Sequence, residues 1–154
     1  MAMQNITFSK MIYGVKGDNS SQIIKNLAAN VGKDIHLSAM ATHQKLESLI
    51  KNSMIGIGGG VALFDWMLDK VDTPYIMCAL LDTPTIFPAV DENMIDVALI
   101  LVSPEKNGPL HLQYLSRLTR MFRDEKLLAN LKSVTCTDGM KSVLLVDNNQ
   151  SIAA

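Results

Sequence analysis

The chain has 154 residues, of which 48% are hydrophobic and only 5% aromatic, and its formal net charge is −1. This length is enough for one domain with a sizeable core, built mainly from aliphatic side chains and Met. The near-neutral charge argues against a broad basic face of the kind that binds nucleic acid or an anionic membrane, so we expect neither partner.

The apolar runs and the cysteines bear on the cellular compartment. The longest apolar runs, such as 97–102, are too short to span a bilayer, so no membrane insertion is expected. The N-terminal residues show no basic segment followed by an apolar signal core. Cys78 and Cys136 fit neither a CxxC motif nor a metal site, and Cys78 reads as a small core residue. These features predict a reduced, cytoplasmic protein.

The first part of the chain is predicted to form a strand and two helices. Residues 11–15 read as a short strand, and the turn at 17–20 supplies an N-cap for a helix that Gly32 is expected to end. Ser38 is expected to cap a second helix. The apolar residues at helical spacing are Ile23, Ile24, Leu27, Ala28 and Val31 in the first helix, and Met40, Leu46, Leu49 and Ile50 in the second.

The second part is predicted to be strands followed by helices. Residues 61–63, 75–81 and 95–102 read as strands, and the pattern becomes helical from Pro109. Asp124 is expected to cap a short helix that runs to Leu131, and a last helix follows the turn at 137–139. The helix that starts at Pro109 is expected to bury Leu110, Leu112, Leu115, Leu118, Met121 and Phe122.

Helices before, between and after apolar strands predict an α/β fold. We expect a three-layer sandwich in which a small mixed β-sheet is flanked by helices on both faces. No repeat, low-complexity tract or linker divides the chain. The prediction is therefore a single domain over residues 1–154, with an ordered core of about 6–148.

Residues 55–65 are the most informative segment, and they read Ile-Gly-Ile-Gly-Gly-Gly-Val-Ala-Leu-Phe-Asp. The backbone N–H groups of Gly56, Gly58, Gly59 and Gly60 suit a loop that cradles a phosphate. The same glycines suit a tight turn between two edge strands. The spacing matches neither the dinucleotide-binding fingerprint nor the Walker pattern, so both interpretations stay open at this point.

The three histidines, His36, His43 and His111, show no metal-ligand spacing, and we expect no metal and no cofactor. His36 and His43 belong to a polar helix face or its edge and are expected at the surface. His111 follows a buried strand and Ser103-Pro104-Glu105, at the start of a predicted helix. The N-terminus of a helix favours an anion, because its free N–H groups and its dipole are positive.

Segment 55–65 resembles the phosphohistidine loop of the EIIA proteins of the mannitol, fructose and nitrogen-regulatory type, the EIIA type-2 domain of the bacterial phosphotransferase system. In that family the loop reads approximately Ser-Thr-Gly-Ile-Gly-x-Gly-Val-Ala-Ile-Pro-His, and the final His carries the phosphoryl group. Further matches are the segments 81–84 and 118–124, and the resemblance extends from about Ile23 to Leu131. It implies the EIIA mannitol/nitrogen-type fold.

The surroundings of His111 resemble the second motif of this family, in which a strand ends in Ala-Pro-Glu and a His-Leu opens the next helix. In the family this second His lies beside the phosphorylated one and helps to orient it or to stabilise its phosphate. The resemblance therefore implies that His111 lies beside residue 65.

Several positions depart from the family pattern. Phe64 and Asp65 stand in place of Pro-His, so that Asp65 occupies the position of the acceptor, and Met54-Ile55 stands in place of Ser-Thr. Ser48-Leu49-Ile50 stands in place of a Glu-Arg-Glu stretch whose Arg helps to hold phosphate. A carboxylate can form an acyl phosphate, but such phosphates usually need Mg²⁺ and acidic neighbours, which are not evident beside Asp65. A buried Trp66 would indicate that the site has been filled.

The resemblance and these departures together predict a regulatory binding module of the nitrogen-regulatory type that has lost phosphorylation on His. It would belong to the phosphotransferase family without catalytic activity. Its site is expected at Asp65 and His111, with binding contacts at Gly56, Gly58, Gly59, Gly60 and Phe64. The alternative is an active phosphoryl carrier that accepts phosphate from an HPr-like protein on His111 or Asp65.

The partners expected from the resemblance are proteins: an HPr-like phosphocarrier, or a transporter or sensor kinase of the kind that relatives of the nitrogen type control. A third hypothesis is a homodimer in which Met side chains and Phe64 pack into a self-interface.

Overall fold

The structure is a computed structural model that describes residues 6–153, and their side chains as far as Leu145. The remaining residues of the predicted 1–154 domain, and the side chains at the end of its predicted core, lie outside this description. The elements in chain order are β1 (Lys10–Val15), α1 (Ser20–Ile35), α2 (Ala39–Asn52), β2 (Gly56–Gly58), β3 (Val61–Leu68), β4 (Tyr75–Thr85), β5 (Ile95–Pro104), α3 (Gly108–Met121), α4 (Glu125–Lys132) and α5 (Thr137–Ala153).

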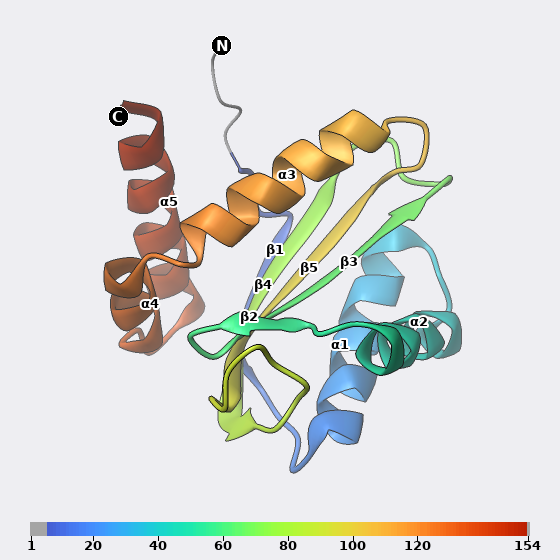
Figure 1. Cartoon of the computed structure of the whole chain (residues 1–154), viewed down its shortest axis with the longest axis horizontal. Coiled ribbons are helices and arrows are strands. Elements are labelled where there is room, and N and C mark those ends of the chain that lie inside the picture. Colours follow the sequence, from blue (N-terminus) through green and yellow to red (C-terminus); the bar gives the residue numbers. More distant parts are fainter. Residues whose placement is uncertain (1–5, 154) are drawn as a thin grey trace.

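The strands form a five-stranded mixed sheet with the order β1-β4-β5-β3-β2. Strand β1 pairs with β4, and β3 with β5, in parallel, whereas β4 pairs with β5, and β2 with β3, antiparallel. Helices α1 and α2 cover one face of the sheet, and α3, α4 and α5 lie on the other (Figure 1). The predicted α/β sandwich with a mixed sheet flanked on both faces is confirmed.

Each face of the sheet contributes to a separate apolar core. Side chains alternate between the faces of a strand, so successive residues of β3 belong to different cores. Ala62, Phe64 and Trp66 pack on the side of α1 and α2, whereas Val61 and Leu63 pack on the side of α3, α4 and α5. Because Asp65 follows the same alternation, its side chain faces α3.

Helix α1 begins where it was predicted, with Asn19 as its N-cap, but it does not end at Gly32. It continues to Ile35, and His36 takes the left-handed conformation that closes it, with φ 60°. A Cβ at Gly32 would lie 2.8 Å from the Leu37 carbonyl oxygen and 2.8 Å from Thr42 Oγ1. This glycine therefore serves the close approach of the two helices instead of a helix end.

The predicted caps of α2 and α4 are confirmed, whereas the predicted apolar faces of α2 and α3 need correction. Ser38 and Asp124 accept hydrogen bonds from the first N–H groups of their helices. Met40 is 71% exposed and Leu112 is 65% exposed, so neither belongs to a core. In α3 the place of Leu112 on the buried face is taken by His111, a polar residue that the apolar pattern did not include.

Candidate functional site

The structure brings the two predicted site residues Asp65 and His111 together. Asp65 lies in the middle of β3 and His111 in the first turn of α3, on the face of the sheet that α3 covers (Figure 1). The His111 Nε2 atom lies 2.9 Å from Asp65 Oδ2. His111 is buried, with 6% of its surface exposed, whereas the Asp65 side chain is 36% exposed. The placement of His111 beside residue 65, which the resemblance implied, is confirmed.

The second ring nitrogen of His111 has a partner that the sequence did not reveal. Nδ1 lies 2.7 Å from the hydroxyl oxygen of Ser103, a fully buried residue near the end of β5. Strands β3 and β5 pair in register, Asp65 opposite Leu101, so Ser103 lies two residues further along the same face. The sequence held one indication of this contact: because side chains alternate along a strand, residues 101 and 103 of β5 point to the same face as Asp65.

These two hydrogen bonds determine where the protons are. An ionised carboxylate is only an acceptor, so Nε2 must carry the hydrogen that points at Asp65. In the neutral imidazole Nδ1 then accepts from the Ser103 hydroxyl, and in the imidazolium it donates to that oxygen. In both forms Nε2 is protonated, and in neither does His111 have a free lone pair. A phosphoryl group could bond to this ring only after one of the hydrogen bonds was broken.

Asp, His and Ser side chains in contact also occur in hydrolases, where the Ser oxygen attacks a substrate. That chemistry requires an accessible hydroxyl. Ser103 is 0% exposed and lies behind His111, so no substrate reaches its oxygen. The arrangement therefore orients an imidazole and does not provide a Ser nucleophile.

A cavity of about 220 Å³ lies next to Asp65, between α3, the segment around β2 and the end of α2. The side chains of Leu115 and Thr119 line it from α3, one and two turns after His111. Asp65 is the only charged residue among the described residues that line it. The others are Leu49, Ser53, Met54, Ile55, Ile57 and Leu63. Apart from Asp65, the wall is therefore mostly apolar.

The glycine-rich segment forms the turn that connects β2 to the first residue of β3. Gly59 and Gly60 both have positive φ, +67° and +82°, as a tight two-residue hairpin requires. The turn interpretation is confirmed, although only β2 is an edge strand, because β3 lies between β2 and β5. Asp65 is five positions after Gly60, so the turn lies roughly 16 Å along the strand from Asp65.

The polar groups of this hairpin are used within the protein. The Gly59 N–H donates to Asp91 Oδ2 over 3.1 Å, and the Gly59 carbonyl accepts from Lys132 Nζ over 2.9 Å. This N–H group, together with those of residue 93, holds the pKa of Asp91 below its usual value. The structure thus gives these backbone groups internal partners, which does not favour the phosphate-cradle interpretation.

Glycine at position 56 has a packing reason. A Cβ there would lie 2.3 Å from the Ala89 Cβ, because β2 passes directly beside the 85–94 segment. Gly58 has φ +109° and precedes the turn. The binding contacts expected of these glycines stay a prediction, and the contacts that the structure shows for them are structural.

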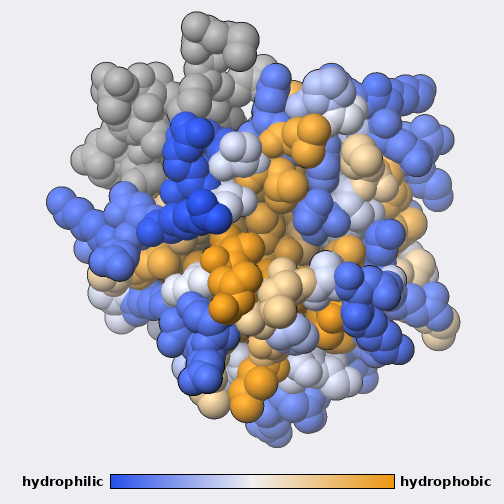
Figure 2. Space-filling view, in the orientation of Figure 1, coloured by the Kyte–Doolittle hydropathy of each residue, from blue (hydrophilic) through white to orange (hydrophobic). Residues whose placement is uncertain are grey.

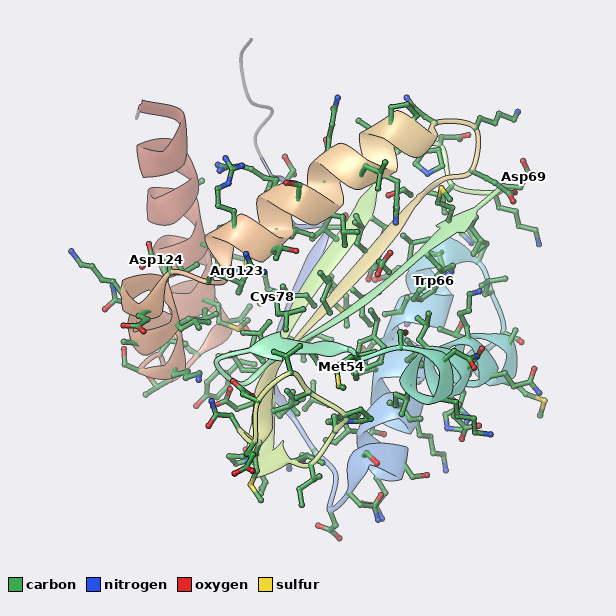
Figure 3. All side chains as sticks on the ribbon, in the orientation of Figure 1. Met54, Trp66, Asp69, Cys78, Arg123 and Asp124 are labelled. Carbon is green, nitrogen blue, oxygen red and sulfur yellow. The ribbon has the colours of Figure 1, made fainter. Side chains whose placement is uncertain are left out.

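Phe64 and Trp66 lie on the other face of β3 from Asp65. Phe64 is 0% exposed and packs edge-on against Phe87, so it cannot touch a partner directly, and its expected binding role requires correction. Trp66 is buried between β3 and α1 (Figure 3). Its indole therefore does not fill the space beside Asp65, because alternation directs the two side chains to opposite faces.

The remaining histidines are near the surface, as predicted. His36 is exposed at the end of α1, and His43 is half-buried, 3.4 Å from Glu47 on the same helix. Among the side chains that the structure describes, residues 6–145, no three of His, Cys, Asp or Glu are grouped as a metal site would require. No helix in that range has the length and hydropathy of a membrane span.

Comparison with known proteins yields matches over most of the chain. The profile of the family described as "Phosphoenolpyruvate-dependent sugar phosphotransferase system, EIIA 2" matches residues 7–145. A nitrogen regulatory protein from Bradyrhizobium diazoefficiens is 29% identical over 133 residues, which cover 84% of this chain and 85% of the relative.

Solved structures show the same fold. Nitrogen regulatory protein IIA-Ntr from Neisseria meningitidis matches with a TM-score of 0.78 at 21% identity, covering 88% of this chain and 92% of that one. A chain in the complex of enzyme IIAMTL and phosphorylated enzyme IIBMTL from Escherichia coli matches with a TM-score of 0.67 at 15% identity, covering 88% and 94%. The predicted mannitol/nitrogen type of fold is confirmed.

Proposed function

Because this chain belongs to the EIIA 2 family of the phosphoenolpyruvate-dependent sugar phosphotransferase system, we propose that it is a regulatory binding module of the nitrogen-regulatory type that does not carry phosphate. The observation that carries the proposal is the hydrogen bond between His111 Nε2 and Asp65 Oδ2, 2.9 Å long. It occupies one oxygen of residue 65, where the family resemblance places the acceptor His, and keeps a proton on the facing nitrogen of His111.

The chemistry of phosphoryl transfer supports this proposal. A His acceptor needs an unprotonated ring nitrogen that the donor can reach. The two nitrogens of His111 are engaged by Asp65 and Ser103, and the ring is buried. Removing the proton from Nε2 would leave a lone pair facing a carboxylate, which is unfavourable.

The surroundings of Asp65 also favour a binding role. Asp65 is the only acidic residue among the described residues that line the cavity. Acyl phosphates in proteins usually form beside a Mg²⁺ ion held by several carboxylates, so a lone carboxylate in an apolar wall is a poor acceptor. The same wall suits contact with another protein.

The alternative function is an active phosphoryl carrier that takes phosphate from an HPr-like protein on Asp65 or His111. One observation favours it. Asp65 Oδ1 has no hydrogen-bond partner within the described part of the chain, and the side chain is 36% exposed, so a donor could reach this oxygen.

Proteins are the proposed partners in both cases. The similar chain from the mannitol system was solved in complex with a second protein of that system, enzyme IIBMTL. For this chain we propose binding to an HPr-like carrier, or to a transporter or sensor kinase, through the face that surrounds the cavity.

Phosphoryl transfer from labelled phosphoenolpyruvate, through enzyme I and an HPr-type donor, tests the proposal. Wild type is compared with Asp65→Asn, Asp65→His and His111→Ala, and a nitrogen regulatory relative is the positive control. We expect no label on the wild type. Acid-labile label lost only in His111→Ala, or hydroxylamine-sensitive label lost in Asp65→Asn, would establish the carrier function instead. Label on Asp65→His alone would show that the donor docks and that residue 65 decides the outcome.

A further inference from the structure

We propose that the cavity beside Asp65 receives one basic side chain, lysine or arginine, from a protein partner. This inference rests on the proposed function, because it names the chemistry by which the binding face recognises its partner. If the inference is right, the site attracts a cation, whereas a site that carries a phosphoryl group must attract an anion.

The first argument is the charge of Asp65. One carboxylate oxygen, Oδ2, is paired with His111, and the other has no hydrogen-bond partner among the residues that the structure describes. The described residues that line the cavity include no Lys or Arg. The wall of the cavity therefore contains one carboxylate and no basic side chain, and the second oxygen of that carboxylate is a free acceptor. A cationic donor is the group that complements this acceptor best.

The second argument is the orientation of α2. The last turn of this helix reaches the cavity, where Leu49 and its C-cap residue Ser53 form part of the wall. The C-terminal end of a helix has a negative partial charge from its aligned peptide dipoles and unpaired carbonyl groups. This end adds to the attraction that Asp65 has for a cation and repels an anion.

The third argument is the size and lining of the cavity. Its volume of about 220 Å³ is below the roughly 300–1,000 Å³ of pockets that enclose a whole small-molecule ligand. Ile57, Leu63 and Leu115 provide an apolar wall. A Lys or Arg side chain has an apolar stem that packs on such a wall and a charged end that reaches the carboxylate.

The surface around the opening indicates that the side chain comes from a protein. Apolar side chains gather in the middle of one face of the molecule, over the region between α3 and β2 (Figure 2). Met54, which follows α2 and lies at the cavity, is 56% exposed (Figure 3). A flexible Met adapts to the contours of a partner. A basic anchor in a pocket, surrounded by apolar contacts, is a common arrangement at protein interfaces.

Binding of short capped peptides, followed by NMR of the ¹⁵N-labelled full chain, tests the inference. The probe is leucine–arginine–leucine, and the same peptide with lysine is a second probe. Citrulline, which has the shape of arginine without its charge, and glutamate replace the basic residue in the controls. We expect saturable shifts at Met54, Ile57, Leu115 and Thr119 with the basic peptides, with affinity on the order of tenfold lower for citrulline.

Two variants separate the role of Asp65 from a general effect of charge. Asp65→Asn is expected to lower the affinity for the arginine peptide to that for the citrulline peptide. Asp69→Asn is the matched control, because Asp69 follows the same strand but lies at its far end from the cavity (Figure 3). It is expected to leave both affinities unchanged.

Several outcomes would overturn the inference. These are equal affinity for the arginine and citrulline peptides, shifts that map away from the cavity, and binding of free n-butylguanidinium as tight as that of the peptide, since the last result would mean a small-molecule site. The proposed function fails separately. If the peptides do not bind and the wild type takes no label from the phosphoryl donor, only the inference falls. Label on Asp65 would overturn the proposed function whatever the peptides do.

Discussion

At the scale of single residues, the imidazole of His111 is held on both sides. Asp65 accepts from Nε2, and the Ser103 hydroxyl pairs with Nδ1 over 2.7 Å. Ser103 touches no solvent, so its contribution is to position the ring and to satisfy a buried nitrogen. The orientation of His111 toward Asp65 therefore depends on Ser103, which lies outside the cavity.

Ser103→Ala is expected to lower the free energy of unfolding by about 1–3 kcal/mol, because the buried Nδ1 loses its partner. Chemical denaturation measures this change, and ¹⁵N shifts of the imidazole report whether Nε2 stays protonated. Ser142→Ala is the control: its exposed hydroxyl pairs only with a carbonyl of its own helix, and the cost should stay within about 0.5 kcal/mol. An equal effect of the two substitutions would contradict the role of Ser103.

The sequence predicted part of this site. Asp65 and His111 are 46 positions apart, and only the family resemblance placed them together, since the spacing of the residues holds no such information. From the sequence, Ser103 was predicted only to follow the end of a strand, and its contact with His111 was not predicted. Its role depends on the register of β5 beside β3, which is decided by pairing between distant segments.

At the scale of elements, the close packing of α1 on α2 depends on Gly32, which has no Cβ. The Gly32 position lies against the Leu37 carbonyl and the Thr42 hydroxyl, which itself pairs with the Ser38 carbonyl. An added Cβ would have to displace backbone at the start of α2. Because α2 leads directly into the cavity segment, this contact also places the wall that contains Met54.

Gly32→Ala is expected to reduce stability by about 1–3 kcal/mol through overpacking, although alanine favours helices in general. Gly108→Ala is the matched control, since nothing lies within 4 Å of a Cβ at this first residue of α3. There the change should be neutral or stabilising by up to about 1 kcal/mol. Thermal unfolding of both variants measures the difference, and a stabilising effect at both positions would show that α1 and α2 are less closely packed.

Elements were predicted better than their ends and faces. The existence of β1, β3, β4 and β5 and of α1, α2 and α3 followed from apolar patterns, since periods of two and 3.6 residues arise from local geometry. Helices α4 and α5 were predicted from the cap at Asp124 and from the turn at 137–139. The predicted end of α1 was wrong. Glycine often ends a helix, but Gly32 lies inside α1, where the absence of a side chain allows close packing against residues 37 and 42. The face of α3 was also predicted incorrectly at its start. The apolar Leu112 is exposed and the polar His111 is buried, because His111 pairs with Asp65 and Ser103.

At the scale of the whole molecule, the sheet separates two cores and shields groups at its centre. Cys78 lies in β4, with no exposed surface, and burial raises the pKa of its thiol to about 12. Near pH 8 it therefore stays protonated and out of reach of a reagent, and it becomes reactive only when the layers separate. Cys136 is exposed.

A thiol reagent at pH 8 is accordingly expected to modify one cysteine in the native protein and both in denaturant. In Cys136→Ser the native protein should show no rapid reaction, and the single remaining thiol should react only on unfolding. Raising the pH toward 9 should still leave Cys78 protected, because its folded pKa remains well above that range. Equally rapid modification of two thiols in the native wild type would contradict the layered packing.

The layered architecture was predictable from the sequence, whereas the strand order was not. Alternating apolar strands and amphipathic helices require helical layers on both sides of a sheet. The order β1-β4-β5-β3-β2 arises from pairings between distant segments, such as β1 with β4. That order places β3 beside β5, which α3 contacts, and thereby assembles a site from three separate parts of the chain.

The central claim is that the site formed by Asp65 and His111 does not take up phosphate. The most direct measurement is the intact mass of the wild-type protein after exposure to phosphoenolpyruvate, enzyme I and an HPr-type donor, kept at neutral pH so that a phosphohistidine would survive. The mass is expected to stay unchanged while a nitrogen regulatory relative in the same reaction gains one phosphate. A phosphate on the wild-type chain that is lost in Asp65→Asn or in His111→Ala would contradict the claim.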